Sequence, residues 1–481
     1  TSITDTRTSA LRLDSKTASL YYPNVFTIAN INMSSSAYIE ESDDARRQMQ
    51  SFFAMAQLGY KESLYLDVTA RNDWSSTLAF TERKSRGFFY PSVGLSWIIP
   101  KSFSMPSLIS FGKVRASWSK VGNDIPLFVS NTVGHIAAGG IPQPNDTAPF
   151  GTLKPEMSSS FEIGTEWKFF DYRMDVDLTF YKTNTKNQLF SLPSSAGAAY
   201  KYYFVNAGNI QNMGVELTFG AVPILTNQFK WNTTLNFSRN KNEVKKLHDD
   251  LASFIQGDEG FSSSYTMRLV EGGSFGDIYG KAFERDKYGA IVYGRDGLPQ
   301  EIGSGNTAKV GNCNPAFLLG WGNSFTYKDF SFYFLIDGHF GGDVLAQTQA
   351  VLDQTGVSKV SGEARTMGYV DLEGHHIYNI KGFYEQVGGR NGVTEYYMYD
   401  ATNIRLRELS LGYTLPKRLL GRKQFLKKAE LSFVARNLFF IYKKAPFDPD
   451  AVLSASNSNQ GIDIFGIPTT RSVGFNVKLS F

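Results

Sequence analysis

Cysteine is almost absent from this chain, since Cys313 is the only one among 481 residues. A single cysteine forms no internal disulfide and no thiolate metal cluster. Long apolar runs are missing too, and no stretch reaches the ~20 apolar residues that a membrane-spanning helix needs. This absence excludes a helical membrane protein. It leaves a membrane β-barrel open, because barrel strands alternate between apolar and polar side chains.

An excess of one charge is also missing. The chain has 49 Lys+Arg against 45 Asp+Glu, a formal net charge of +4, and no block of basic residues stands out. Nucleic-acid binding therefore has no electrostatic footprint, and we expect no nucleic-acid partner. Charged residues make up only 20% of the chain, whereas aromatic residues make up 14%. This profile favours a β-rich fold, because aromatic and β-branched side chains fit pleated surfaces.

Motifs for catalysis or metal binding are weak. The sequence GGSFG at 272–276 fits the G-x-S-x-G pattern of α/β-hydrolases, but that motif needs a buried strand before it and a helix after it. Here it falls in a long loop, so its glycines predict turns. The pair His375-His376 lacks any zinc spacing and is predicted to be solvated. We expect no enzyme, no catalytic or metal-ligating residue and no cofactor. A structural calcium ion stays open in the acidic loops at 286–297 and 446–452.

Period-two alternation is the dominant pattern that is present. In YRMDVDLTF, residues 172–180, apolar side chains occupy every second position, and Arg173, Asp175 and Asp177 lie between them. Successive side chains of a strand face opposite ways, so each such run has one apolar and one polar face. The pattern predicts about 13 strands, near 49–59, 63–72, 88–98, 110–119, 158–169, 172–183, 210–220, 228–240, 315–327, 329–340, 401–414, 427–438 and 470–481.

The connections between these runs alternate between short and long. Hairpin turns are predicted at 60–62, 170–171 and 328–329, and long links near 120–157, 241–314, 341–400 and 441–469. Short turns on one side and long loops on the other are typical of outer-membrane barrels. We therefore predict an all-β fold, a transmembrane antiparallel β-barrel with long extracellular loops. A water-soluble sheet with its apolar face in a core is the alternative.

The end of the chain fits the same interpretation. VGFNVKLSF at 473–481 alternates and ends on Phe481, which we predict to be a barrel-assembly signal. An odd strand count leaves residues 1–48 as an extracellular loop region at the start of a fragment, with 49–481 as barrel. Closed bacterial barrels have an even number of strands, and an open sheet edge is not tolerated in lipid. We expect the C-terminal part of a larger barrel, without a plug domain.

The segment YYMYDATNIRLRELSLGYTLPKRLL at 396–420 resembles the penultimate-hairpin signature of SusC-like (RagA-like) TonB-dependent transporters of the Bacteroidetes. The resemblance continues in order through most of the chain from residue 64, in LYLDVTARNDWSS (64–76), FFYPSVGLSWII (88–99), KVRASWSKVGN (113–123), LKPEMSSSFEIGTEWKFFDYRMDVDLTFYKTNTKNQL (153–189), VNAGNIQNMGVELTF (205–219), EGGSFGDIYGKAFERD (271–286), PAFLLGWGNSFTYKDFSFYFLIDGHFGGD (315–343), ARNLFFIYKKAPFDPD (435–450) and GIPTTRSVGFNVKLSF (466–481).

The resemblance implies a ~22-stranded barrel in outer-membrane lipid of a Gram-negative cell, with an N-terminal plug. It also implies a SusD-like surface lipoprotein over the mouth, and a TonB complex that engages the missing N-terminal part. A dimer of transporter–lipoprotein pairs stays open. The expected function is the barrel part of an importer of oligomeric nutrients, glycans before peptides. The alternative is an outer-membrane anchor or secretion-associated barrel without import.

Two groups of side chains are candidates for function. Tyrosines in outer loops suit sugar faces, peptides or a lid, and we predict such contacts for Tyr200, Tyr202, Tyr203, Tyr396 and Tyr397. For the last two, an aromatic girdle at the membrane interface is an equal alternative. On the polar face, opposite charges are predicted to pair across strands or to hold the plug, and these are Arg115, Glu162, Glu166, Arg173, Asp175, Asp177, Glu216, Arg405, Arg407 and Arg436.

Overall fold

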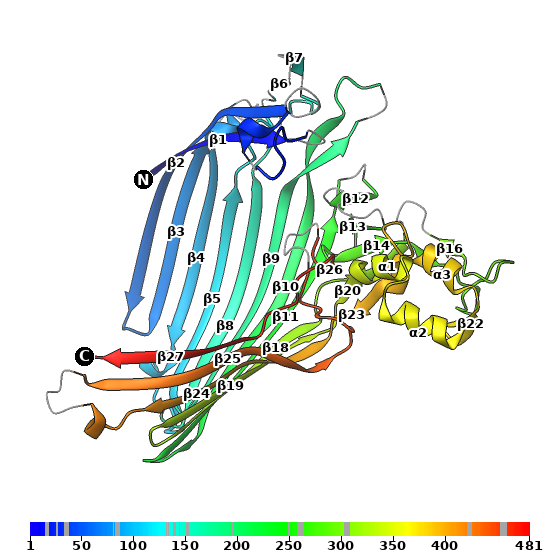
Figure 1. Ribbon diagram of the computed structural model, residues 1–481. Helices are drawn as coiled ribbons and strands as arrows, with labels where there is room; N and C mark the ends of the chain where they lie inside the picture. The colour runs from blue at the N-terminus through cyan, green and yellow to red at the C-terminus, as the bar shows by residue number, and fades with distance from the viewer. Residues whose placement is uncertain are drawn as a thin grey trace.

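The chain folds around one large antiparallel sheet of 14 strands (Figure 1). The computed structural model describes residues 1–14, 19–25, 27–32, 38–79, 81, 87–130, 132, 134–137, 141–143, 145–150, 153–194, 197–248, 251–256, 264–302, 308–420, 426–452 and 459–481. Within these residues the sheet curves without closing, so that β1 and β27 form its two edges.

Every strand of the sheet pairs with the next one along the chain. The strands are β1 (Ser2–Asp14), β2 (Tyr38–Tyr60), β3 (Leu64–Ser75), β4 (Gly87–Ile98), β5 (Ile109–Asn123), β8 (Glu156–Phe169), β9 (Met174–Pro193), β10 (Tyr202–Leu225), β11 (Phe229–Lys246), β18 (Phe317–Tyr327), β19 (Phe330–Phe340), β24 (Asn403–Thr414), β25 (Lys428–Lys443) and β27 (Ser472–Ser480). All the predicted strands are therefore present.

The predicted count of about 13 strands is one too low, because the sequence analysis missed β1. This strand pairs with the first half of β2, from Ser2 opposite Ser51 to Asp14 opposite Tyr38. Its sequence, SITDTRTSALRLD, has no continuous apolar face, so alternation gives no signal there. With an even count, the argument from an odd number no longer holds. Residues 2–14 and 38–48 lie in β1 and in the first part of β2, and the assignment of the rest of 1–48 to a loop at the start of a fragment stays a prediction.

The two faces of the sheet differ as the alternation predicts. Residues directly opposite one another in a ladder share a face. One row crosses five strands through Leu66, Leu95, Ala116, Ile163 and Phe180. The next row, displaced by one residue along each strand, runs through Asp67, Gly94, Ser117, Glu162 and Tyr181. We call these the apolar face and the polar face.

Rings gather on the apolar face near the short turns. The ring centroids of Trp231 and Phe325 lie 5.7 Å apart, those of Phe325 and Phe332 6.0 Å apart, and those of Phe330 and Tyr413 4.8 Å apart. An aromatic band of this kind is typical of the girdle of a membrane barrel.

The alternation of short and long connections is confirmed. At one end of the sheet the links between strands are short, as at 61–63, 170–173, 226–228 and 328–329. At the other end they are long, at 124–155, 247–316, 341–402 and 444–471. We call the end with the long links the loop end.

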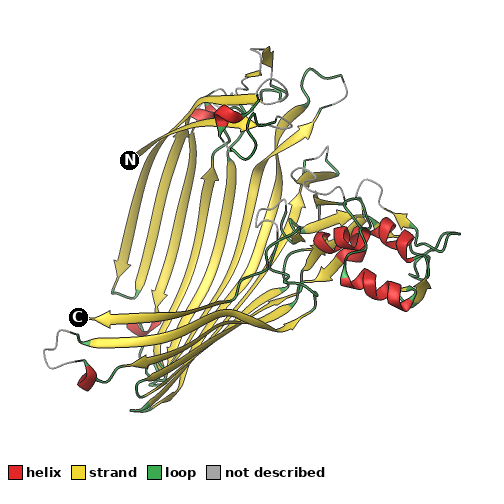
Figure 2. Cartoon of the chain, in the orientation of Figure 1, coloured by secondary structure: helices red, strands yellow, loops and turns green. Residues whose placement is uncertain are grey.

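Two of the long connections, 247–316 and 341–402, fold together, and we call their described residues the loop domain. They contain β12 (Ser253–Gln256), β13 (Tyr265–Val270), β14 (Asp277–Gly280), β15 (Ala282–Phe283), β16 (Glu301–Ile302), β17 (Ala308–Asn312), β20 (Asp343–Ala346), β21 (Val370–Leu372), β22 (His375–Ile377) and β23 (Met398–Asp400). The three α-helices also lie here, α1 (Gln347–Gln354), α2 (Lys359–Met367) and α3 (Ile380–Val387), as Figure 2 shows in red.

The loop domain also contains a 3-10 turn at 394–397. Further short elements lie in other connections, namely β6 (His135–Ala137), β7 (Ile141–Gln143), β26 (Ile462–Asp463) and single 3-10 turns at 28–30, 76–78, 99–101 and 417–419. No helix among the described residues combines the length and the apolar character needed to cross a membrane.

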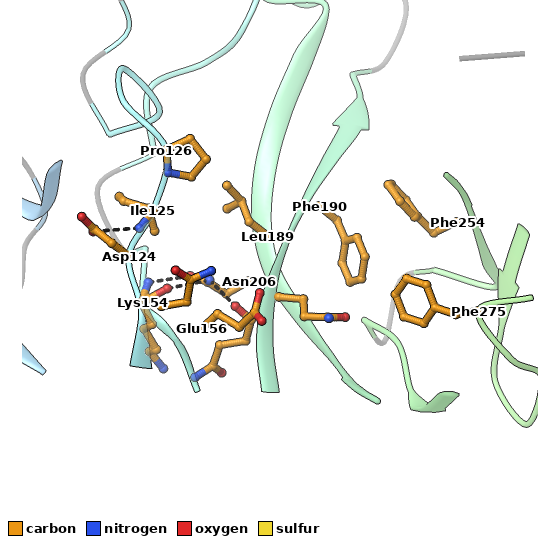
Figure 3. A pocket seen from close by; sticks show the side chains of 13 residues that line it. Asp124, Ile125, Pro126, Lys154, Glu156, Leu189, Phe190, Asn206, Phe254 and Phe275 are labelled. Carbon is orange, nitrogen blue, oxygen red and sulfur yellow. Dashed lines mark hydrogen bonds between the residues drawn. The ribbon is translucent and has the colours of Figure 1, made fainter. Parts of the chain in front are cut away.

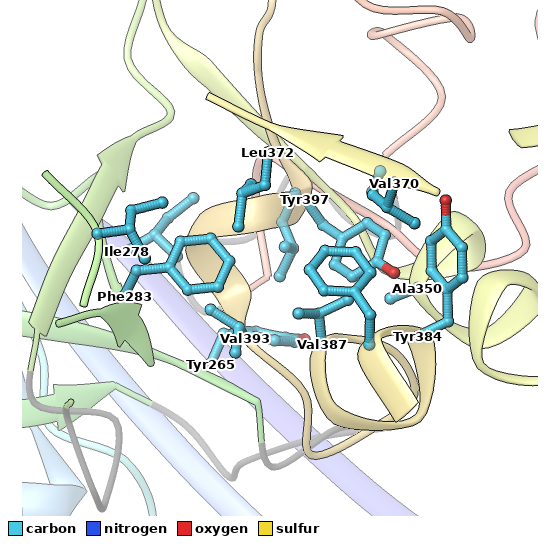
Figure 4. Close-up of a cluster of buried hydrophobic side chains, with 14 of the residues drawn as sticks. Tyr265, Ile278, Phe283, Ala350, Val370, Leu372, Tyr384, Val387, Val393 and Tyr397 are labelled. Atoms are coloured by element: carbon cyan, nitrogen blue, oxygen red, sulfur yellow. The ribbon is translucent and has the colours of Figure 1, made fainter. Parts of the chain in front are cut away.

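The loop domain is built around a hydrophobic core, to which connection 444–471 adds Ile462 and Ile464 (Figure 4). Phe383 and Val387 of α3 are fully buried there together with Tyr397, and strands β13 and β14 contribute Met267 and Ile278. Phe383 and Val387 are four residues apart, so they lie on the same side of α3 and point into this core. The largest core of the molecule is therefore outside the main sheet.

Candidate functional site

A pocket lies on the polar face of the sheet at the loop end (Figure 3). The row Ser158, Thr185, Ile210 and Val244 belongs to this face, and Ile210 and Val244 are buried beneath loop residues. Loop 124–155 forms a second small core on the same face, around Phe88 and Leu153. The pocket opens between these two cores and has a volume of about 520 Å³.

Amide side chains form the floor of the pocket. The Asn206 side chain spans two neighbouring segments, since its Nδ2 donates to the carbonyl oxygens of Lys154 (2.8 Å) and Asn187 (2.9 Å). Its Oδ1 accepts from the backbone N–H of Lys154 (2.6 Å). Gln188 also lines the pocket, and its buried Oε1 accepts no hydrogen bond within the described chain. The floor thus combines fixed amide groups with one buried acceptor that has no partner in the described part of the chain.

Three phenylalanine rings form the opposite wall. The centroids of Phe190 on β9 and Phe254 on β12 lie 4.5 Å apart, and Phe275 lines the pocket beside them. The backbone N–H of Phe275 donates to Oδ1 of Asn242 (2.8 Å), which ties this part of the loop domain to β11. Rings beside convergent amide groups can bind a ligand that has both an apolar surface and hydroxyl or amide groups.

Asp124 fixes the remaining edge of the pocket. Its buried carboxylate accepts short hydrogen bonds from the hydroxyls of Ser75 and Thr77, and it lies 3.0 Å from Nη2 of Arg47. The backbone N–H of Ile125 also donates to it (2.8 Å). Because Arg47, Ser75 and Thr77 lie on β2, on β3 or just beyond β3, loop 124–155 is anchored to the sheet.

Several charged side chains on the polar face pair with one another, as the interpretation that opposite charges pair across strands predicts. Arg115 reaches across β8 to Asp177 (2.7 Å), and it passes over Gly164, where a Cβ atom would lie 2.7 Å from its Nε. Arg436 lies 3.0 Å from Glu408. Arg173 instead donates to the carbonyl oxygens of residues 222 and 223, and Glu166 lies 3.3 Å from Lys168. Glu162, Asp175 and Glu216 share this face.

The strongest charge cluster fastens connection 444–471 to the polar face. We call it the Arg405 cluster, and it consists of Arg405, Arg407, Asp337, Asp448 and Asp450. Arg405 is 1% exposed; its Nη2 donates to Asp448 (3.0 Å) and Asp450 (2.9 Å), and its guanidinium carbon lies 4.2 Å from the ring centroid of Phe440. Arg407 bonds Asp337 at short range and lies 3.6 Å from Asp450.

This cluster also bears on the loop at 446–452, for which calcium stayed open. The two aspartates of this loop, Asp448 and Asp450, accept hydrogen bonds from the guanidinium group of Arg405. In the described part of the chain, no group of three His, Cys, Asp or Glu side chains is placed to hold a metal ion.

The five tyrosines predicted to contact substrate or lid fall into two groups. Tyr200, Tyr202 and Tyr203 are exposed at the loop end, where the backbone N–H of Tyr202 donates to the carbonyl oxygen of Asp146 (3.0 Å). Their proposed contacts stay a prediction. Tyr396 and Tyr397 instead pack in or against the core of the loop domain.

Tyr397 requires a correction, because it is 1% exposed and offers no surface to a ligand or a membrane. Its hydroxyl donates to Oδ2 of the buried Asp353 (3.1 Å). Burial, reinforced by the negative charge of Asp353, raises the pKa of Tyr397 above its usual value, so the phenol stays protonated as a donor. The sequence analysis missed this structural role. Phe481 lies exposed directly after β27, and its assembly role stays a prediction.

The weak catalytic motifs have structural explanations. Ser274 lies in the turn between β13 and β14, and its Oγ accepts from the side-chain amides of Asn312 (2.8 Å) and Asn314 (3.0 Å). His375 and His376 point to opposite sides of the β21–β22 hairpin, where they stack on Tyr293 and Tyr369 with centroid distances of 4.0 Å each.

The pocket itself was missed from the sequence. Asn187, Asn206, Phe254 and Phe275 come from separate segments, and the one motif among them, GGSFG around Phe275, points to a turn and not to a pocket. The φ angles are positive at Asn187 (+59°) and Gly208 (+83°), and the β9–β10 ladder keeps its register on both sides of this position. An asparagine and a glycine within alternating strands are the only signals that sequence offers.

Comparison with known proteins identifies the family. The family model described as TonB dependent receptor-like, beta-barrel matches residues 5–297. The chain belongs to this family. A TonB-dependent receptor of Formosa agariphila, P3, is 26% identical over 93% of this chain and 47% of its own length. The TonB-dependent receptor SusC of Bacteroides thetaiotaomicron is 22% identical over 92% of the chain and 46% of its own length.

Solved structures share the fold. The RagAB peptide importer in its "open-open" state superposes with a TM-score of 0.72 at 18% identity, over 92% of this chain and 48% of the other. The chain therefore spans about half the length of the relatives it matches. Its family places this TonB-dependent receptor chain in the outer membrane, with the apolar face of the sheet toward lipid.

This orientation predicts that one substitution destabilises the barrel strongly at one position and little at the adjacent position. In the full-length protein, Ala116→Arg puts a charge on the apolar face and should destabilise the barrel by about 2–4 kcal/mol if it lies near the bilayer midplane. Ser117→Arg puts the same charge on the polar face, opposite Glu162, and should cost little. Urea unfolding in lipid vesicles measures both. Equal destabilisation by the two variants would contradict the assignment of the faces.

Proposed function

We propose that this chain forms the wall and the extracellular loop domain of an outer-membrane importer of oligomeric nutrients. TonB drives the importer, and a SusD-like surface lipoprotein covers it. The observation that carries the proposal is the pocket on the polar face at the loop end, held between two anchored loop cores. The apolar face in lipid and the charged wall below the pocket are consistent with a route for a polar solute.

We favour an oligosaccharide over a peptide as the ligand of this pocket, although Asp124, Lys154 and Glu156 also line it. Its polar groups include the neutral amides of Asn123, Asn187, Gln188 and Asn206, and three phenylalanine rings face them. A sugar has hydroxyls that both donate and accept hydrogen bonds, and an apolar ring face that lies against an aromatic side chain. Peptide is the competing substrate, and the RagAB peptide importer, which shares the fold, is the reason to test it.

Transport by these residues needs no covalent chemistry. The amide groups and rings bind and orient the incoming oligomer, while the anchored Asp124 edge keeps the pocket open toward the polar face. Release then depends on the lipoprotein and on TonB, which acts through parts of the full-length protein.

The test uses the full-length transporter purified with its surface lipoprotein. Binding of fluorescent neutral oligosaccharides (α-glucan, β-glucan, mannan and galactan fragments) is compared with binding of fluorescent peptides. Phe254→Ala should weaken oligosaccharide binding about tenfold, which corresponds to about 1.4 kcal/mol. Ile255→Ala is the matched control, because this neighbour on β12 is exposed outside the pocket.

Three results would count against the proposal. Binding of peptides alone would replace the substrate class and keep the importer. Equal effects of Phe254→Ala and Ile255→Ala would exclude this pocket as the binding site. Absence of uptake by cells that produce the intact complex, whatever the solute, would favour an anchor or a secretion-associated barrel.

A further inference from the structure

A strip of three rings lies on the loop domain, away from the pocket described above; His376 and Tyr378 are exposed and Tyr369 is half-buried. His376 on β22 stacks on Tyr369 with centroids 4.0 Å apart and an interplanar angle of 29°. Tyr369 in turn meets Tyr378 edge-on at 6.4 Å and 62°. We call these three residues the ring strip. All three surround the β21–β22 hairpin, so a short backbone segment fixes their relative positions.

The core of the loop domain does not account for this strip. Core residues of the same hairpin, Val370, Leu372 and Ile377, are buried beneath it. Tyr378, in contrast, is 74% exposed. A large ring that leaves its face in solvent adds little to folding by burial. Its flat surface is therefore available for a ligand.

A cavity of about 630 Å³ adjoins the strip. It lies between the end of α1, the last turn of α2 and one side of α3, and Tyr378 belongs to its lining as well as to the ring strip. This volume is within the range of about 300–1,000 Å³ found for small-molecule pockets. The ring of Tyr378 and the cavity thus form one continuous surface.

Hydrogen-bonding groups of both kinds line this cavity. Gln354 and Arg365 lie on its α1 and α2 sides, and Lys381 and Glu385 on its α3 side. Arg365 uses Nη2 to bond the carbonyl oxygen of Gly356 (2.8 Å), which holds its guanidinium at the rim. Lys381 and Glu385 lie 3.6 Å apart, so the charges balance locally and favour no strongly charged ligand.

We propose that the ring strip and the adjoining cavity form a second carbohydrate-binding site, which holds a neutral oligosaccharide on the loop domain. Tyr378 lies against the apolar face of one sugar ring, while the side chains of Gln354, Arg365 and Glu385 bond its hydroxyls. The site acts as a collecting surface that raises the local concentration of the oligomer near the polar-face pocket. This inference rests on the proposed function, because it assumes the same class of substrate.

The experiment measures binding of the same fluorescent oligosaccharides to the intact transporter–lipoprotein complex. Tyr378→Ala should weaken total binding about three- to tenfold and remove one of two classes of sites. Tyr378→Trp, which keeps a flat ring, should retain both classes. Tyr288→Ala is the matched control, because Tyr288 is 82% exposed on the same domain and does not line the cavity. It should change nothing.

The outcomes separate this inference from the proposed function. If Phe254→Ala weakens binding but Tyr378→Ala does not, the collecting surface is wrong and the importer proposal stands. If Tyr378→Ala releases the lipoprotein and leaves oligosaccharide binding unchanged, the strip is a protein contact and the inference is overturned. If the wild-type complex binds none of the oligosaccharides, the proposed substrate fails and the inference fails with it.

Discussion

Replacing Arg405 by methionine should release connection 444–471 from the wall of the sheet. Asp448 and Asp450 would then lie at the polar face without the cation that now bonds both, at 3.0 and 2.9 Å. Removing one partner of a buried ion pair typically costs about 3–5 kcal/mol, because the remaining charge is left uncompensated. We therefore expect amide exchange in the peptide around Thr469, whose N–H donates to Asp448, to accelerate by at least ~100-fold.

The matched control is Arg436→Met on the neighbouring strand. Arg436 also pairs with a carboxylate, at 3.0 Å from Glu408, but its side chain is 61% exposed. An exposed pair of this kind contributes about 1 kcal/mol or less. Hydrogen exchange by mass spectrometry on the full-length protein measures both variants. Similar protection of the Thr469 peptide in the two variants would show that the segment does not depend on the Arg405 cluster.

The attachment of connection 444–471 to the sheet depends on pH through the ionisation of the Asp448 carboxyl. Burial alone would raise the pKa of this carboxyl, but the Thr469 hydroxyl, two backbone N–H groups and Arg405 together hold it below the usual value of 3.8. The stability that depends on the carboxylate is therefore fully present above pH 3.8 and is lost as the pH falls through the lower value in the folded protein. The wild-type segment should stay protected at neutral pH and open only in strong acid. In Arg405→Met it should be open at neutral pH.

The sequence predicted the sheet well because the information there is local. Each strand such as 172–183 shows its own alternation, and the same pattern locates the apolar face. The extent of β9, β10 and β11 was underestimated, because these strands continue past the alternating part to the loop end, where loop residues cover them and both faces become apolar or mixed. Strand β1 was missed because its sequence has no continuous apolar face, although its backbone pairs with β2.

The site could not be predicted in the same way because its contacts are remote in sequence. Arg405 binds aspartates 43 and 45 residues away. The local sequence marks Tyr397 as a loop aromatic beside a strand, and its partner Asp353, 44 residues earlier, shows that it belongs inside a core. The eight-residue helix α3 is too short for a helical period to stand out. Local sequence patterns therefore predict the strands of the sheet, whereas the pocket is visible only from tertiary contacts between distant segments.

Phe383→Ala should unfold the loop domain while leaving the sheet intact. Phe383 is fully buried, and its ring lies 5.3 Å from the ring centroids of both Tyr384 and Tyr396. Truncating a phenylalanine in a packed core costs about 3–5 kcal/mol, through lost burial and the cavity that remains. A small domain has little stability beyond this amount. We expect protease to cleave within 341–402 in the variant and not in the wild type.

Met367→Ala on α2 is the control, because Met367 is 57% exposed and its loss should change stability by about 0.5 kcal/mol or less. The resistance of the folded barrel to denaturation in detergent, followed as its shift on an unheated gel, should be the same in both variants. The strands are held by their own ladders, and β19 and β24 pair along their whole length without help from the connection between them. A barrel that unfolds together with the loop domain would instead mean that the two form one cooperative unit. Substitutions in the loops that alter binding would then also lower the stability of the sheet.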